Sequence, residues 1–207
     1  MEAQGLGLYV AASLALIATP GQDMLYVVSR SLAQGRLAGA CSALGVSLGI
    51  LVHTALAALG VGALLHAYPA LFLALRIAGA AYLVYLGVRM LLSPARLADA
   101  ARREPLPLWA LVRQGVLSNV SNPKIVLFFV AFLPQFVDPA SPHATRDLAL
   151  LGALYAALAL PVKAAIGILA GAFSERLTRS AAAFAWMNRA GAAVLIALGA
   201  RLAVGGR

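Results

Sequence analysis

Apolar residues fill the chain in long blocks, and polar residues are concentrated in short stretches between these blocks. No Asp, Glu, Lys or Arg occurs from Leu37 to Leu75. About 20 apolar helical residues cross a bilayer core about 30 Å thick, so this run suffices for a span, a turn and part of another span. The blocks and the breakers between them predict six transmembrane helices, at about 5–31, 38–65, 70–92, 113–137, 147–172 and 186–204.

Composition agrees with this pattern. Hydrophobic residues make up 62% of the 207 residues, against roughly 45–50% in a soluble domain, and the mean hydropathy is +0.90. We therefore expect an all-α integral membrane protein whose residues 1–207 form a single multi-pass transmembrane domain. A formal charge of +9 can indicate nucleic-acid binding, but here the basic residues lie in short loops between apolar spans, which fits anionic lipid and membrane topology instead.

Arginines concentrate in or beside the first, third and fifth connections, namely Arg30, Arg36, Arg89, Arg96, Arg102, Arg103, Arg113, Arg176, Arg179 and Arg189. By the positive-inside rule these connections are cytoplasmic, and both termini then lie outside. Pro20 interrupts the first span, so a re-entrant first segment, with the N-terminus inside, stays open as an alternative.

The second half of the chain resembles the first. The segments GAAYLVYLGVR (Gly79 to Arg89) and GAAVLIALGAR (Gly191 to Arg201) share seven of eleven residues without a gap. Three spans followed by three similar spans insert with opposite orientation, which is an arrangement common in secondary transporters. The sequence thus predicts two inverted three-helix repeats, at about 5–92 and 113–204, joined by a cytoplasmic loop at about 93–112.

Each repeat also begins with a broken helix. Pro20-Gly21 interrupts the first span and Asn122-Pro123 interrupts the fourth. Lipid cannot satisfy the backbone groups that a break releases, so both breaks should face each other inside the bundle. The half-helix after each break would direct its free N–H groups and positive dipole at a cavity, where a substrate carboxylate could bind.

Two charged residues accompany the breaks. Asp23 follows the first, and we interpret it as a substrate or proton site, with the alternatives that it caps the following half-helix or extends to a membrane interface. Lys124 follows the second, and the alternative to a substrate contact is a side chain that extends to the membrane interface. Asn119 and Asn122 could cap freed backbone groups or bind substrate.

Lys163, two residues after Pro161, and His53 lie within spans and are further candidates for proton coupling beside Asp23. A packed core histidine is the alternative for His53. The expected substrate-binding set is Pro20, Gly21, Asp23, Asn119, Asn122, Pro123 and Lys124. No cofactor, resident metal or catalytic residue is expected.

These residues resemble the lysine exporter (LysE/RhtB) family of bacterial amino-acid exporters over nearly the whole chain. The resemblance depends on Pro20-Gly21-Gln22-Asp23, on SRSLAQGRLAG from Ser29, on GAAYLVYLG from Gly79 and on NPKIVLFFVAFLPQF from Asn122. Family members often have PGPD at the first element, where this chain has Gln22. The resemblance implies a bacterial inner-membrane protein, with a homodimer left open, that exports an amino acid or derivative from the cytoplasm by proton antiport.

Two other function classes are weaker alternatives. A divalent-cation exporter would need clustered carboxylate, histidine or thiolate ligands within the spans, and only Asp23 and His53 qualify. An intramembrane hydrolase would need a nucleophile beside a base, but Ser47 and His53, the nearest pair, are six residues apart and on different helix faces.

Overall fold

All regular secondary structure in the computed structural model is helical within the residues it describes, which are 3–61, 69–92, 104–138, 141–172 and 181–204. Three short elements complete interrupted spans: η1 and η3 are π-helical and η4 is a 3₁₀ turn. In chain order the elements are α1 (Ala3–Ala18), α2 (Gln22–Gln34), α3 (Arg36–Leu56), η1 (Ala57–Val61), α5 (Pro69–Leu92), α6 (Leu108–Val120), α7 (Pro123–Leu127), η3 (Phe128–Phe132), η4 (Leu133–Phe136), α8 (Ala144–Ala172) and α10 (Ala181–Val204).

Each predicted span overlaps one of these helices or a bent pair of them. The predicted fourth span begins too late in the chain, because α6 starts at Leu108. Pro107 directly precedes α6, and its extended backbone suits the position before a helix. The last span also began too late, because α10 starts at Ala181 in a run of alanines, which favour helix strongly. The predicted loop at 93–112 is therefore shorter, and its residues 93–103 lie outside the described part of the chain.

Three helical segments are long and apolar enough to cross a membrane: 36–60, 73–92 and 144–172. The pair α1 and α2, bent by 49°, and the pair formed by α6 and 123–136, bent by 52°, raise the number to as many as five among the described residues. The chain is therefore a multi-pass membrane protein. The sixth predicted span coincides with α10, which is not among these segments, so the six-helix inverted repeat stays a prediction.

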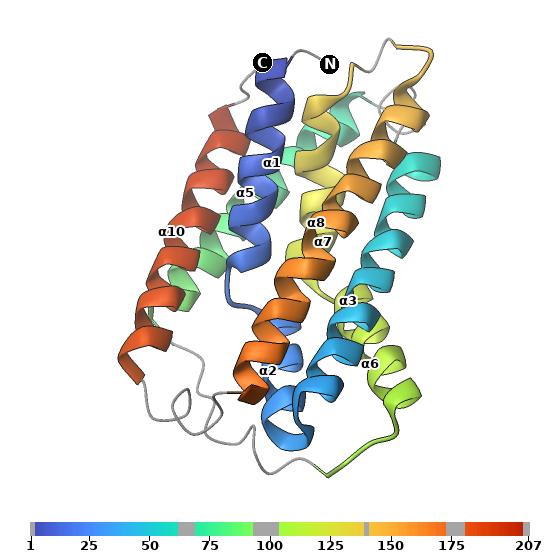
Figure 1. Ribbon diagram of the computed structural model, residues 1–207. Helices are drawn as coiled ribbons and strands as arrows, with labels where there is room; N and C mark the ends of the chain where they lie inside the picture. The colour runs from blue at the N-terminus through green and yellow to red at the C-terminus, as the bar shows by residue number, and fades with distance from the viewer. Residues whose placement is uncertain (1–2, 62–68, 93–103, 139–140, 173–180, 205–207) are drawn as a thin grey trace.

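The helices run side by side, and successive spans run in opposite directions, with each bent pair counted as one span (Figure 1). The start of α1 and the end of α10 lie at one end of the bundle, and α2 ends at the opposite end (Figure 1). The most extensive contacts join α5 to α10 and join α3 to both α6 and α8. Aromatic rings fill the centre, where the rings of Phe128 and Tyr155 lie 4.7 Å apart and Tyr9 Oη donates to Leu151 O at 2.7 Å.

Glycines allow α3 to approach two neighbours closely. A Cβ built on Gly49 would lie 2.7 Å from Asn119 Cβ on α6, and one on Gly167 of α8 would lie 3.0 Å from the Gly39 carbonyl carbon. Helices that meet at small residues pack backbone to backbone. These glycines therefore pack helices within one chain, and the contact at Gly49 brings Asn119 beside α3.

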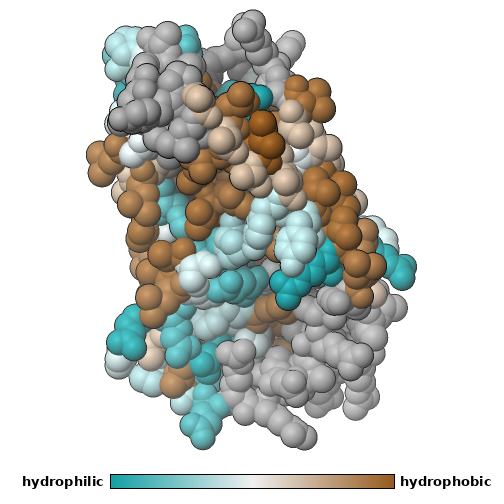
Figure 2. All heavy atoms as spheres, turned by 180° about the vertical axis from the view of Figure 1, so that it is seen from behind, coloured by the Kyte–Doolittle hydropathy of each residue, from teal (hydrophilic) through white to brown (hydrophobic). Residues whose placement is uncertain are grey.

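Large apolar side chains cover much of the outside of the bundle. Leu56 is 62% exposed, Leu59 78% and Leu92 78%, which suits contact with lipid. Seen from behind, apolar side chains of the described residues lie along both flanks and across the upper middle of the molecule, while hydrophilic ones gather across its middle and lower left (Figure 2).

Candidate functional site

The two predicted breaks are present, and their half-helices begin differently. Gly21 precedes α2 with an extended backbone and has no side chain to cap the helix. Asn122 precedes α7, and its Oδ1 accepts a hydrogen bond from the Lys124 backbone N at 3.1 Å. A capped N-terminus has one of its free N–H groups satisfied. The N-terminus of α7 is thus partly closed by a side chain, whereas that of α2 has no such cap.

Each break supplies a polar side chain to the helix that ends at the other break. Lys124 Nζ donates to the carbonyl oxygens of Leu16 at 3.2 Å and Thr19 at 3.1 Å, where α1 ends. Gln22 Nε2 donates to Ser118 O at 2.9 Å and to Ser121 Oγ at 3.2 Å, where α6 ends. We call these contacts the reciprocal caps, because each adds a side-chain donor from one break to the last turn of the helix that ends at the other break. Leu16 O also accepts from Thr19 N at 3.3 Å, whereas Thr19 O lies beyond the end of α1.

The interfacial alternative for Lys124 is therefore wrong. Its side chain is 6% exposed, and its ammonium group points at helix carbonyls inside the bundle. An ammonium group has three hydrogens to donate, and two of them have these protein acceptors. A Cβ at Gly21 would lie only 3.2 Å from Lys124 Nζ, so the absence of a side chain there makes room for the ammonium group.

Asp23 forms a buried ion pair across the bundle. Its Oδ2 lies 3.4 Å from Lys163 Nζ on α8 and accepts a hydrogen bond of 2.7 Å from Asn119 Nδ2 on α6. The residue is 1% exposed. The capping alternative for Asp23 is wrong, since Gly21 occupies the N-cap position and Asp23 is the second residue of α2. The carboxylate instead links α2 to α6 and α8.

His53 extends this network by one contact. Its Nε2 lies 3.2 Å from the Asn119 backbone oxygen, and since a carbonyl only accepts, Nε2 must carry the proton in that hydrogen bond. Three buried polar atoms nearby have no hydrogen-bond partner within the described residues: Asp23 Oδ1, Asn119 Oδ1 and Tyr155 Oη. Ser47 Oγ is likewise unpartnered there, so it makes no hydrogen bond with His53.

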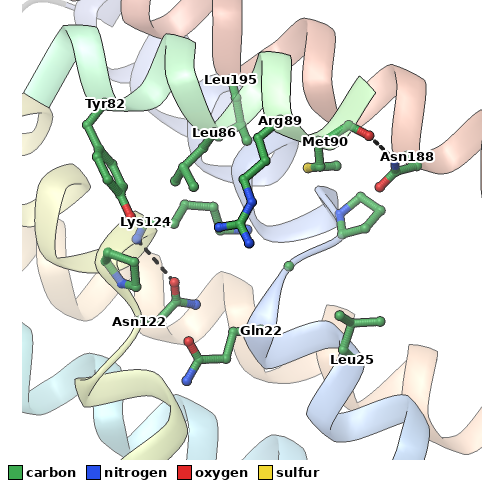
Figure 3. Close-up of a pocket in the computed structure, with 13 residues that line it drawn as sticks. Gln22, Leu25, Tyr82, Leu86, Arg89, Met90, Asn122, Lys124, Asn188 and Leu195 are labelled. Atoms are coloured by element: carbon green, nitrogen blue, oxygen red, sulfur yellow. Dashed lines mark hydrogen bonds between the residues drawn. The ribbon is translucent and has the colours of Figure 1, made fainter. Parts of the chain in front are cut away.

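A cavity of about 480 Å³ opens between the two breaks and the helices α5 and α10 (Figure 3). Its size lies in the range of about 300–1,000 Å³ that is typical of small-molecule sites. The residues that line it are Pro20, Gly21, Gln22, Leu25, Tyr82, Leu86, Arg89, Met90, Asn122, Pro123, Lys124, Asn188 and Leu195.

The predicted site residues thus fall into two groups. Five of them line the cavity: Pro20, Gly21, Asn122, Pro123 and Lys124. The others, Asp23, Asn119, His53 and Lys163, are absent from its lining and form the buried network instead. We call this second group the Asp23 network. It is joined directly to the cavity wall, because Asp23 follows Gly21 and Gln22 on the same half-helix.

The sequence analysis missed four polar cavity residues. Arg89 was assigned only to the charge asymmetry of the loops, and Gln22 only to a departure from a family motif. Tyr82 was interpreted as a packing residue, and Asn188 was not considered. Arg89 ends the repeated segment GAAYLVYLGVR, so the glycine and arginine spacing of that repeat was the available signal. That spacing distinguishes Arg89 from the other arginines, but neither the spacing nor the charge of Arg89 could show that its side chain faces the cavity.

Comparison with known proteins agrees with a membrane protein built from long apolar helices. The LysE type translocator family matches residues 14–206, and the chain belongs to this family. No group of three or more His, Cys, Asp or Glu side chains suited to a metal ion occurs in the described part of the chain.

Several bacterial membrane proteins are similar to the chain. An uncharacterized membrane protein of Pseudomonas aeruginosa is 39% identical over 182 residues, which cover 84% of each chain. A leucine efflux protein of Salmonella choleraesuis is 33% identical over 136 residues, which cover 65% of this chain and 64% of that protein. An uncharacterized membrane protein of Vibrio cholerae is 32% identical over 142 residues, or 69% of each chain. No solved structure matches the chain.

Proposed function

We propose that the protein exports an amino acid or an amino-acid derivative from the cytoplasm by proton antiport, as a multi-pass protein of the bacterial inner membrane. The observation that carries this proposal is the cavity between two broken helices, with a buried carboxylate on one of those helices directly behind the cavity wall. Membership of the LysE type translocator family and similarity to leucine efflux proteins support it.

The substrate carboxylate is the group that the breaks are suited to bind. The N-terminus of α2 has no side-chain cap and carries N–H groups and a positive dipole end at the cavity, where Gly21 and Gln22 line the wall. Lys124 borders the same space with its third N–H. A carboxylate held there would accept hydrogen bonds from both halves of the proposed inverted repeat, so its arrival and departure would depend on how the two halves are arranged.

Proton coupling is assigned to the Asp23 network. The ionised carboxylate attracts Lys163 and accepts from Asn119, and both contacts hold α2 against its neighbours. A proton on Asp23 removes the charge that attracts Lys163, so it weakens the attachment of the half-helix that borders the substrate. In this mechanism a proton that enters from outside releases α2, and loss of the proton to the cytoplasm restores the ion pair. His53 lies one contact further along this network and is the candidate relay.

The substrate can be identified by an export screen. Cells that express the chain are fed amino acids as dipeptides, and the amino acids released to the medium are measured. The exporter function predicts faster release of at least one amino acid than from cells with an empty vector. No increase for any amino acid would refute it.

The coupling mechanism is tested with the substrate from that screen in vesicles that hold the purified chain under a pH gradient. Asp23→Asn keeps the shape and an acceptor for Asn119 but cannot exchange a proton. It should therefore lose uphill accumulation while still exchanging substrate across the membrane without a gradient. Asp147→Asn, an acid in the first turn of α8, is the matched control and should accumulate normally. Normal uphill accumulation by Asp23→Asn would refute the proton role.

A further inference from the structure

We propose that Arg89 anchors the carboxylate of the exported amino acid, and that the cavity consequently selects substrates with neutral apolar side chains over cationic ones. This inference rests on the proposed function and adds to it a substrate class and a residue that determines it. The side chain belongs to the last turn of α5, on the cavity wall opposite the two breaks (Figure 3).

The Arg89 guanidinium extends into the cavity toward Lys124 (Figure 3). It makes no hydrogen bond or ion pair with any residue in the described part of the chain, whereas the guanidinium of Arg30 donates to Glu104 O and Gln114 Oε1. A guanidinium carries five N–H donors in a planar fork that fits the two oxygens of a carboxylate. Arg89 therefore offers a cavity ligand a complete two-pronged contact.

Lys124 cannot replace Arg89 in this role. Two of its three hydrogens already have acceptors at the end of α1, so it has one donor left for a ligand. The ammonium is also a point charge, without the planar fork that fixes the orientation of a carboxylate. We therefore assign orientation of the substrate to Arg89 and a supporting contact to Lys124.

No acidic side chain balances these cations on the described cavity wall. Asp23, the nearest acid in sequence to the first break, lies outside the lining and is paired with Lys163. The acceptors that remain are neutral: Gln22 and Asn188 donate their amide N–H groups to backbone carbonyls, which leaves their amide oxygens for a substrate α-ammonium group.

The rest of the wall is apolar and is formed by Leu25, Leu86, Met90 and Leu195, with Tyr82 at one side. A substrate with an aliphatic side chain could bury that side chain against them. A lysine or arginine substrate would instead bring a second positive charge into a space that already holds Arg89 and offers no carboxylate partner. The cavity thus matches a zwitterion with an apolar side chain.

Arg89 has two alternative roles that the experiment must separate. A cation in the last turn of α5 interacts favourably with the helix dipole, and a basic residue beside a predicted cytoplasmic loop helps to orient the protein. Neither role distinguishes a substrate carboxylate from an amide, and neither should change KM selectively. Arg113→Met removes another exposed arginine near that loop, from outside the cavity lining, and is the matched control.

The test measures exchange of labelled L-leucine across vesicles that hold the full purified chain. We expect the wild type to exchange L-leucine, to be inhibited by excess unlabelled L-leucine, and to be inhibited far less by L-lysine or by L-leucinamide, which lacks the carboxylate. Arg89→Met should raise the KM for L-leucine about 10- to 100-fold, the loss expected for a charged hydrogen-bonded contact, with a smaller effect on kcat. Arg89→Lys should recover part of the loss, and Arg113→Met should match the wild type.

Melting temperatures of the purified variants show whether each is folded. A wild-type KM in Arg89→Met, or equal losses in Arg89→Met and Arg113→Met, would overturn the anchor. Strong inhibition by L-lysine or L-leucinamide would overturn the selectivity argument. If the wild type exchanges no amino acid of any class, the exporter function itself fails, and this assignment fails with it.

Discussion

Replacing Lys163 by methionine should destabilise the protein strongly, because it leaves the Asp23 carboxylate buried without its counter-charge. Lys163 Nζ lies 3.4 Å from Asp23 Oδ2, and both side chains are at most 4% exposed. At that separation, and with an effective dielectric constant near 20, the attraction is about 5 kcal/mol. Removal of one partner from a buried pair typically costs about 3–5 kcal/mol in the free energy of unfolding, and we expect a loss in that range.

Addition of Asp23→Asn to Lys163→Met should reverse most of this loss of stability. In the combined variant Asp23→Asn plus Lys163→Met no charge remains, and the amide oxygen that replaces the carboxylate can still accept from Asn119 Nδ2. Replacement of both members of a buried pair is often close to neutral. We therefore expect the double variant to be more stable than Lys163→Met alone by at least about 2 kcal/mol, although it should not couple transport to protons.

The wild type, Asp23→Asn, Lys163→Met and the double variant form a double-mutant cycle. Their stabilities can be compared by reversible unfolding in mixed detergent micelles, with helix content as the signal. Arg201→Met, which removes an exposed cation near the end of α10, is the control and should change the stability by less than about 1 kcal/mol. A coupling energy below about 0.5 kcal/mol, with the double variant as unstable as Lys163→Met, would refute the reasoning. This result would mean that solvent or another group compensates the negative charge of the Asp23 carboxylate.

Two further predictions concern the first break and the topology. In Gly21→Ala the new Cβ would lie 3.2 Å from Lys124 Nζ, so this variant should displace the ammonium group and slow transport. Gly5→Ala is the control and should leave the transport rate unchanged, because a Cβ there has nothing within 4 Å. Equal transport rates in the two variants would mean that the room at Gly21 is not needed. In a background without the native cysteine, a cysteine at Glu104 should be shielded from an impermeant thiol reagent in intact cells and one at His143 should be labelled, and the reverse result would invert the proposed orientation.

The breaks and the elements of the fold were predictable because they depend on local chemistry. Apolar block length predicts a span whatever the tertiary structure, and Pro20 and Pro123 interrupt a helix wherever it packs. The start of α6 was misplaced because residues 108–112, which directly follow Pro107, were not recognised as helical. Such boundaries depend on single residues at the edge of a block, and hydropathy averaged over a window does not resolve them.

The pairings within the site could not be predicted in this way. Lys163 is 140 residues from Asp23, and only the packing of α8 on α2 and α3 brings them together. The same holds for Lys124, whose charge indicated a substrate contact, whereas its position shows two hydrogen bonds to the end of α1. Arg89 was assigned to topology because that rule counts charges near span ends without regard to the direction in which a side chain points.

The reciprocal caps have a consequence for the order in which the protein is made. The Thr19 carbonyl accepts from a lysine 105 residues further along the chain, which the ribosome has not yet added when α1 enters the membrane. Gln22, in contrast, is already in place when Ser118 and the end of α6 arrive. The second broken helix can therefore be capped as soon as it inserts, while the end of the first must keep contact with water or with the insertion machinery until Lys124 is synthesised.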